Sequence, residues 1–335
     1  MSSLTTDSED DIGWKRCLVA GASAFGISAL LLFAMLVLVD PYDSGRGWLG
    51  IDGVDDRNTY TSAASRARDP QFDAAIIGNS TAQPLNPADL SRATGLRFVQ
   101  LYLTGGSPRE QLAVLDFFLR HHPRVGALVF VTDPFWCQHR RAETRPGDFP
   151  YWIYGTNSFA YAARLMSREG IEHAFQRIAI GLDMRKRKRV DGFYSYEDVW
   201  LPGSFRDLNP PRDPAPALSA AERDFFPEIA ELDAAVKKLP ADVPVVIAVP
   251  PTLATTVARS GTVAAQEREA CDAALAKIVA GRPRSNFLNY RIDNAQTRDR
   301  VNFADFIHYR ESLAGKIVSG VAESLRLGNA AKVAF

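Results

Sequence analysis

The sequence predicts an α/β domain, in which helices cover both faces of a parallel β-sheet, preceded by one transmembrane helix. Two observations lead to this prediction. Residues 17–39 contain no charged side chain, and short apolar runs alternate with helical patterns through most of the remaining chain. A chain of 335 residues is long enough for such an anchor and one large domain with an apolar core.

The uncharged segment 17–39 would rise about 34 Å as a helix, which is enough to cross the core of a bilayer. A cleaved signal peptide is the alternative, but its apolar region is usually shorter, and Val37–Pro41 lacks the small residues that a signal peptidase prefers. Lys15 and Arg16 precede the segment, so the positive-inside rule places residues 1–16 in the cytoplasm. We therefore expect a single-pass protein of the bacterial inner membrane with a periplasmic C-terminal domain.

The exported part divides into a juxtamembrane connector at 40–70, with a short helix at 59–68, and a domain at 71–335. The strands expected in this domain are 73–78, 98–103, 127–131, 245–249 and 286–290. Its helices are expected to begin near Pro87 and to cover 110–121, 221–238 and 264–280. The stretch 134–220 is too long for a simple crossover between strands, so we expect it to be an insertion.

Charge and cysteine content exclude several classes of function. Lysine plus arginine equal aspartate plus glutamate at 39 each, so no global field favours nucleic acid as a partner. The three cysteines form no CxxC motif and no zinc-site spacing with histidine, and we expect neither a metal nor a cofactor. Cys137 and Cys271 could pair in an oxidising compartment, or could remain two separate buried thiols.

Small and polar residues follow the expected strands at the points where they end. These segments are 78–80, 104–107, 132–134 and, beyond the last strand, 302–308. Ligands of open parallel sheets bind at the carboxyl ends of the strands, so we expect the four segments to converge on one edge.

The same edge could hold a nucleophilic serine with its base. Ser80 could act as the nucleophile, His308 as the general base, and Asp305 as the carboxylate that orients the imidazole. The backbone N–H groups of Ser80 and of Gly105 or Gly106 could stabilise a developing oxyanion.

These residues resemble the conserved blocks of the SGNH (GDSL-like) hydrolase superfamily. Ile76–Ser80 is similar to the first block, Gly105 or Gly106 to the glycine of the second, and Asp305–His308 to the D-x-x-H motif. The resemblance implies a flavodoxin-like three-layer α/β/α fold with strand order 2-1-3-4-5. It also implies acyl-ester chemistry through an acyl-enzyme on Ser80, with Asp305 and His308 completing the triad.

The anchor followed by Asp40-Pro-Tyr, together with residues 302–310, more closely resembles membrane-anchored envelope members of that superfamily, akin to the alginate O-acetylation and teichoic-acid acylation proteins. This likeness implies an O-acyltransferase or acyl esterase that acts on a cell-envelope or exported polysaccharide. Its partners would be the membrane, the polysaccharide and a membrane protein that donates the acyl group.

One position departs from the family pattern. Asp133 stands where the third block has an asparagine that donates to the oxyanion, and a carboxylate there would repel negative charge. Either backbone donors suffice, with Asn79 or Thr132 assisting, or the site binds without efficient turnover. The alternative function is therefore a non-catalytic SGNH-fold component that binds glycan or acts as a scaffold in an envelope polysaccharide export complex.

The expected insertion contains an aromatic run at 149–154 and a basic run at 185–189. The aromatic residues could stack on sugars or line an acyl pocket, but a satellite core is the simpler interpretation. The basic run could face anionic polymer or lipid headgroups, although a solvated loop is simpler. The residues that we name as candidate substrate contacts are Asp133, Trp136, Tyr309 and Arg310.

Overall fold

The computed structural model describes residues 7–51, 53–54, 58–141, 149–187, 189–197, 205–207 and 225–331. The chain divides into two compact units. Unit 1 consists of Met1–Val54 and Thr156–Lys186, and unit 2 of Asp55–Gly155 and Arg187–Phe335. Unit 1 thus contains the N-terminal helix, the first part of the expected connector and the middle of the expected insertion.

Unit 2 contains a parallel sheet whose five strands are β1 (Ala74–Asn79), β2 (Phe98–Leu103), β3 (Ala127–Val131), β4 (Val245–Val249) and β5 (Asn286–Asn289). The strand order is β2-β1-β3-β4-β5, and every neighbouring pair is parallel. All residues of the first four strands are buried, which explains why these strands are largely apolar in the sequence, with Asn79 and Gln100 as buried polar exceptions. The predicted fold class and strand order are confirmed.

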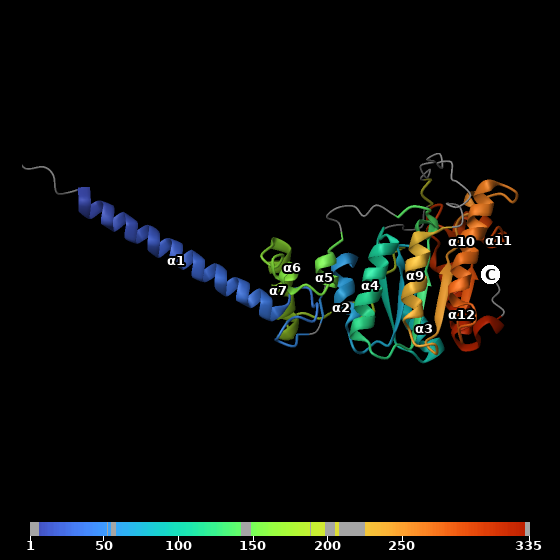
Figure 1. The fold of residues 1–335 in the computed structure, drawn as a ribbon, viewed down its shortest axis with the longest axis horizontal. Helices are drawn as coiled ribbons and strands as arrows, with labels where there is room; N and C mark the ends of the chain where they lie inside the picture. Colours follow the sequence, from blue (N-terminus) through green and yellow to red (C-terminus); the bar gives the residue numbers. More distant parts are fainter. Residues whose placement is uncertain are drawn as a thin grey trace, which may run out of the picture. The chain divides into compact units, whose positions relative to one another are not determined.

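Helices surround this sheet in two layers (Figure 1). The longer helices are α2 (Thr59–Ala67), α3 (Pro87–Thr94), α4 (Pro108–His121), α9 (Pro227–Lys237), α10 (Val263–Val279) and α12 (Glu311–Leu327). Helices α3 and α12 pack together on one face, while α2, α4, α9 and α10 follow one another on the other. Of the predicted helix 221–238, residues 221–224 lie outside the described residues.

Short elements connect these layers. They are the helical turns α5 (Tyr151–Tyr154) and α11 (Ala295–Arg298) and the 3₁₀ turns η1 (Pro134–Cys137), η2 (Ala254–Thr256), η3 (Arg300–Asn302) and η4 (Gly328–Ala330). A disulfide joins Cys137 of η1 to Cys271 of α10, which decides between the two alternatives for this pair. The aromatic run around α5 is largely satellite core, as predicted, since Phe149 and Tyr154 are buried and stacked at 4.8 Å.

Part of the basic run is structural rather than solvated. Within unit 2, Arg187 pairs with Asp69 at 3.0 Å, and the guanidinium of Arg189 lies 3.8 Å from the ring centre of Tyr194. Lys188 lies outside the described residues. Arg185 and Lys186, in unit 1, are exposed.

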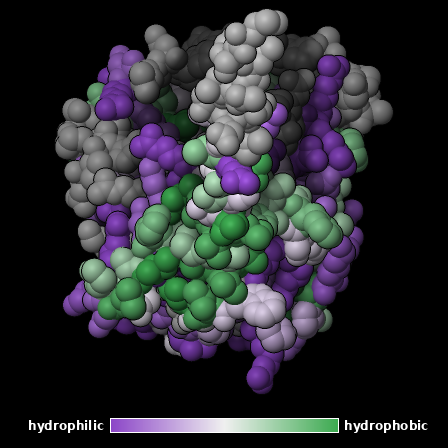
Figure 2. All heavy atoms as spheres, turned by 90° about the vertical axis from the view of Figure 1, so that its left-hand side faces the viewer, coloured by the Kyte–Doolittle hydropathy of each residue, from purple (hydrophilic) through white to green (hydrophobic). Residues whose placement is uncertain are grey.

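Unit 1 begins with α1 (Asp7–Val39), and its stretch Gly13–Val39 is long and apolar enough to cross a membrane. Two more helices, α6 (Ser158–Ala162) and α7 (Arg168–Gly181), come from the insertion. Helix α7 packs on α1, and the last apolar residues of α1, Leu36 and Val39, are buried. Figure 2 shows that apolar residues gather in a patch on the face that it draws.

Helix α1 ends at Val39, and the next residue, Asp40, has a left-handed backbone with φ of 52°. The Asp40 carboxylate accepts hydrogen bonds from the Ser44 hydroxyl, from the N–H groups of residues 45, 46 and 47, and from the Tyr161 hydroxyl of α6. One buried carboxylate therefore fixes the loop after α1 and joins it to the insertion.

Candidate active site

Ser80 lies in a tight turn directly after β1. Gly78 permits this turn, because a Cβ atom there would lie 2.7 Å from the Cβ of Ala82 and 3.0 Å from the carbonyl oxygen of Val131. The turn is closed by hydrogen bonds from the N–H of Ala82 to the carbonyl of Asn79 and from that of Gln83 to the carbonyl of Ser80. Ser80 itself is only half-buried, so its hydroxyl can be reached by a substrate.

Two buried side chains hold the carbonyl groups of this turn. The Gln100 amide of β2 donates to the Ala82 carbonyl at 2.6 Å, and the Tyr309 hydroxyl donates to the Thr81 carbonyl at 2.7 Å. Tyr309, a predicted substrate contact, is fully buried in this structure. Its side chain supports the Ser80 turn instead.

His308 and Asp305 are presented by a loop between Phe303 and Tyr309, which form an antiparallel bridge. The N–H of Ala304 donates to the carbonyl of His308 at 2.8 Å, which narrows the loop. Asp305 Oδ1 accepts from the backbone N–H groups of Ile307 and His308 at 2.9 and 2.8 Å. The loop conformation thus depends on the Asp305 carboxylate.

The three predicted residues form one chain of hydrogen bonds. Ser80 Oγ lies 2.9 Å from His308 Nε2, and His308 Nδ1 lies 2.7 Å from Asp305 Oδ2. The order of partners is that of a nucleophile, a general base and an orienting carboxylate. Segments 228 residues apart in sequence are brought together with this geometry.

The groups around Asp305 favour the ionised form of its carboxyl group. Burial alone would raise the pKa of its carboxyl, but the hydrogen bond and charge of His308 and the two backbone N–H donors lower the pKa below its ordinary value. An ionised Asp305 favours the His308 tautomer that carries its proton on Nδ1, which leaves Nε2 free to accept a proton from Ser80.

Asp133, at the end of β3, is buried beneath the Ser80 turn rather than open to solvent. Its carboxylate accepts from Asn79 Nδ2 and from the Phe135 N–H, the latter at 2.6 Å. Burial raises the pKa of Asp133 to about 7, although the Phe135 N–H and the charge of Arg291 lower it. Its predicted contact with substrate does not fit this position, and its oxygens are engaged with neighbours in the protein.

The side chain of Asn79, an expected oxyanion donor, also forms hydrogen bonds within the protein. Its Nδ2 donates to Asp133, and its Oδ1 accepts from the N–H and the hydroxyl of Thr81 at 3.0 and 2.9 Å. Asn79 is also buried, so we assign it to positioning of the turn.

The glycines after β2 lie beside Ser80, because the sheet register pairs Asn79 with Leu103. Gly105 is exposed and has φ of 68°, which favours glycine. The N–H of Gly106 donates to the Leu103 carbonyl at 2.9 Å within the turn. The N–H groups of Ser80 and Gly105 therefore remain the predicted oxyanion donors.

The other two candidate substrate contacts are Trp136 and Arg310. Trp136 is fully buried, which is incompatible with a contact to substrate. Arg310 is half-buried and pairs with Glu197 at 3.5 Å between the charged atoms.

Sequence reasoning missed the residues that support His308 from the insertion. The Tyr196 ring meets the imidazole edge-on at 5.7 Å between centres, and its hydroxyl donates to the Tyr309 carbonyl. Glu197 accepts from the Glu311 N–H at 2.6 Å. No local signal marks these residues, because their partners are more than 100 positions away in the chain.

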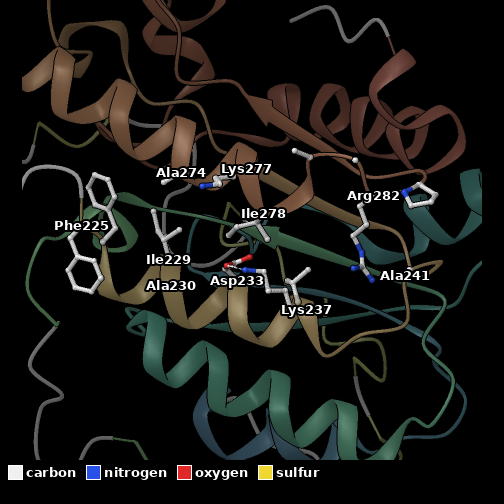
Figure 3. Close-up of a pocket in the computed structure, with 15 residues that line it drawn as sticks. Phe225, Ile229, Ala230, Asp233, Lys237, Ala241, Ala274, Lys277, Ile278 and Arg282 are labelled. Atoms are coloured by element: carbon white, nitrogen blue, oxygen red, sulfur yellow. Dashed lines mark hydrogen bonds and ion pairs between the residues drawn. The ribbon is translucent and has the colours of Figure 1, made fainter.

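A separate cavity of about 570 Å³ lies between α9 and α10, and Ser80, Asp305 and His308 are not among its lining residues. Figure 3 shows Asp233 and Lys237 of α9 joined by an ion pair, facing Lys277 and Ile278 of α10. Among the described residues, no group of three or more His, Cys, Asp or Glu side chains is arranged to hold a metal ion.

Comparison of the chain with family models, with curated proteins and with solved structures finds no match.

Proposed function

We propose that the protein is a membrane-anchored acyl-transfer enzyme with Ser80 as its nucleophile. The observation that carries this proposal is the hydrogen-bond chain from Ser80 Oγ through His308 to Asp305. A serine hydroxyl is a weak nucleophile until an adjacent base takes its proton, and this arrangement supplies the base and its orienting group.

In the first half-reaction, Ser80 Oγ attacks the carbonyl carbon of an acyl ester while His308 Nε2 takes the hydroxyl proton. The tetrahedral oxyanion is stabilised by the backbone N–H groups of Ser80 and Gly105. The intermediate collapses, the carbon–oxygen bond to the alcohol breaks, and His308 returns its proton to the leaving oxygen. An acyl ester on Ser80 remains.

In the second half-reaction, a hydroxyl oxygen attacks the acyl carbon while His308 Nε2 takes its proton. The bond from the acyl carbon to Ser80 Oγ then breaks, and His308 returns the proton to Ser80. Water makes the protein an esterase, and a sugar hydroxyl makes it an O-acyltransferase. We propose a cell-envelope or exported polysaccharide as the sugar substrate, because an enzyme anchored through α1 with its catalytic unit in the periplasm shares a compartment with such polymers.

Two features support anchoring with the catalytic unit in the periplasm. The last turn of α1 is buried within unit 1, so removal of α1 as a signal peptide would take away part of a folded core. The Cys137–Cys271 disulfide suits an oxidising compartment. Alkaline phosphatase fused after Phe335 should therefore be active, whereas an inactive fusion would reverse the orientation.

The catalytic proposal is tested by a fluorophosphonate probe on the full chain in detergent micelles. We expect labelling of the wild type and of Ser319→Ala, which removes an exposed serine of α12, but none of Ser80→Ala. Absence of labelling in a folded wild type would favour the alternative of a glycan-binding or scaffold component.

A further inference from the structure

Helix α7 has three distinct faces. One face is buried within unit 1 and includes Gly170, His173, Ala174 and Arg177. A second face is polar, with Arg168 and Glu172 forming an exposed ion pair at 2.8 Å. The third face is apolar, yet the protein does not bury it.

The apolar face follows the helical period. Ile171, Phe175, Ile178 and Leu182 are spaced by four, three and four residues, which places them in one stripe. Phe175 is 60% exposed and Leu182 is 65% exposed, while the two isoleucines are half-buried. A continuous exposed apolar stripe on a soluble domain marks a surface that meets another apolar phase.

The buried face fixes α7 at the end of the candidate membrane span. The guanidinium of Arg177 donates to the carbonyl of Val39 at 2.6 Å and to that of Asp40, and it pairs with Asp43 at 2.9 Å. Val39 is the last residue of the span. A helix attached to that residue by buried hydrogen bonds must lie at the depth where the chain leaves the bilayer.

The burial pattern of α1 also indicates that α7 lies at the depth where the chain leaves the bilayer. Its side chains from Gly13 to Ser28 are exposed, but Ala29, Leu32, Phe33 and Leu36 are partly or fully buried, at helical spacing. Protein therefore covers one side of α1 over its last three turns, which still belong to the apolar span.

Other exposed side chains of unit 1 have the composition of a membrane interface. Trp48 is 83% exposed, Phe159 89% and Met184 78%, and Arg185 and Lys186 follow directly. Tryptophan and cationic side chains are enriched at the boundary between headgroups and acyl chains, where aromatic rings insert and cations meet lipid phosphate.

We infer that α7 is an interfacial helix, whose stripe of Ile171, Phe175, Ile178 and Leu182 inserts into the outer leaflet of the membrane that α1 spans. The occupant of the apolar face is lipid, because the face continues from the end of the span. This inference rests on the proposed anchoring and does not depend on the chemistry of Ser80. It gives unit 1 a second attachment to the membrane.

The test uses the full chain in vesicles of phosphatidylcholine and phosphatidylglycerol. A cysteine is introduced at Phe175→Cys or Leu182→Cys in a Cys17→Ser background and labelled with a fluorophore, since the other two cysteines are bonded to each other. Matched controls are Glu169→Cys, on the polar face of the same helix, and Val301→Cys, an exposed apolar position of unit 2. Each substitution replaces an exposed side chain, so none removes core packing.

We expect brominated lipids to quench the labels at 175 and 182 several-fold more strongly than those at 169 and 301, and aqueous iodide to show the reverse order. Quenching of 175 and 182 by iodide alone, or by neither agent, would overturn the inference in favour of water or of protein at this face. Flotation of the vesicles separates the two proposals, because a chain that does not float with lipid contradicts the anchoring itself.

Discussion

Two loops of the molecule are each organised by one buried carboxylate, and only one of them belongs to the candidate active site. Asp40 in unit 1 binds three backbone N–H groups and two hydroxyls. Asp305 in unit 2 binds two backbone N–H groups with one oxygen and the imidazole of His308 with the other.

The difference lies in what each carboxylate leaves available. The groups that donate to the Asp40 carboxylate are backbone N–H groups and hydroxyls, and their hydrogen bonds fix the conformation of the loop. His308 has a second ring nitrogen, Nε2, which lies 2.9 Å from Ser80 Oγ. The imidazole therefore links the Asp305 carboxylate to the candidate nucleophile. A carboxylate that shapes a loop therefore becomes part of a candidate active site only through a partner that can also accept a proton.

The largest expected effect is on catalysis in the Asp305 loop. Ser80→Ala and His308→Ala should each lower kcat for p-nitrophenyl acetate by about 10³-fold or more, and Asp305→Asn by about 10³–10⁴-fold. Steady-state kinetics of the full chain in detergent measure this. Turnover in His308→Ala within about tenfold of wild type would contradict the role of His308 as base.

The matching change in the other loop should alter structure without altering chemistry. Asp40→Ala leaves the N–H groups of residues 45–47 without their acceptor, so their amide exchange should speed up on the order of 100-fold. The turnover of p-nitrophenyl acetate should stay near the wild-type value. Loss of turnover with unchanged amide exchange would show that the comparison is wrong.

Asp133 is a third buried carboxyl group, and its contribution to the free energy of unfolding should depend on pH. The pKa of about 7 in the folded protein lies above that of an unfolded aspartate, so the native state retains a proton that the unfolded state loses. Its contribution to stability is full below about pH 4 and is lost as the pH rises through about 7.

The wild type should therefore lose about 1–3 kcal/mol more unfolding free energy between pH 5 and pH 8 than Asp133→Asn does. Denaturant unfolding at the two pH values measures the difference. Asp116→Asn, at an exposed position of α4, is the matched control. An equal pH dependence in wild type and Asp133→Asn would contradict the burial argument.

The smallest expected effect concerns support of the nucleophile turn. Tyr309→Phe removes the hydroxyl that donates to the Thr81 carbonyl, at a cost of about 1 kcal/mol. If that cost falls on the transition state, kcat drops about fivefold with KM unchanged. Tyr151→Phe, which changes an exposed ring, should leave kcat unaltered, and an unchanged kcat in Tyr309→Phe would limit Tyr309 to a role in stability.

The sequence predicted those parts of the fold whose signal is local. The strands Ala127–Val131 and Val245–Val249 are buried on both faces, so they appear as uninterrupted apolar runs, and Phe98–Leu103 is interrupted only by Gln100. The Ser80, Asp305 and His308 set could be proposed because strand ends meet at one edge of a parallel sheet.

Other features depend on contacts between distant segments and leave no periodic pattern. Tyr196 and Glu197 act on the Asp305 loop from the insertion, and Cys137 and Cys271 are 134 positions apart. Trp136 and Tyr309 are candidate substrate contacts in the sequence, but both are fully buried. Their burial follows from packing that the sequence alone does not specify.

The proposed function requires that Ser80 form a covalent acyl intermediate. The most direct measurement is acid quenching of the full chain after brief exposure to p-nitrophenyl acetate, followed by peptide mass spectrometry. We expect the mass of one acetyl group on the hydroxyl of Ser80 in the wild type and in Ser319→Ala, and none at any serine of Ser80→Ala. Acetylation of another residue, or turnover by Ser80→Ala at the wild-type rate, would contradict the claim.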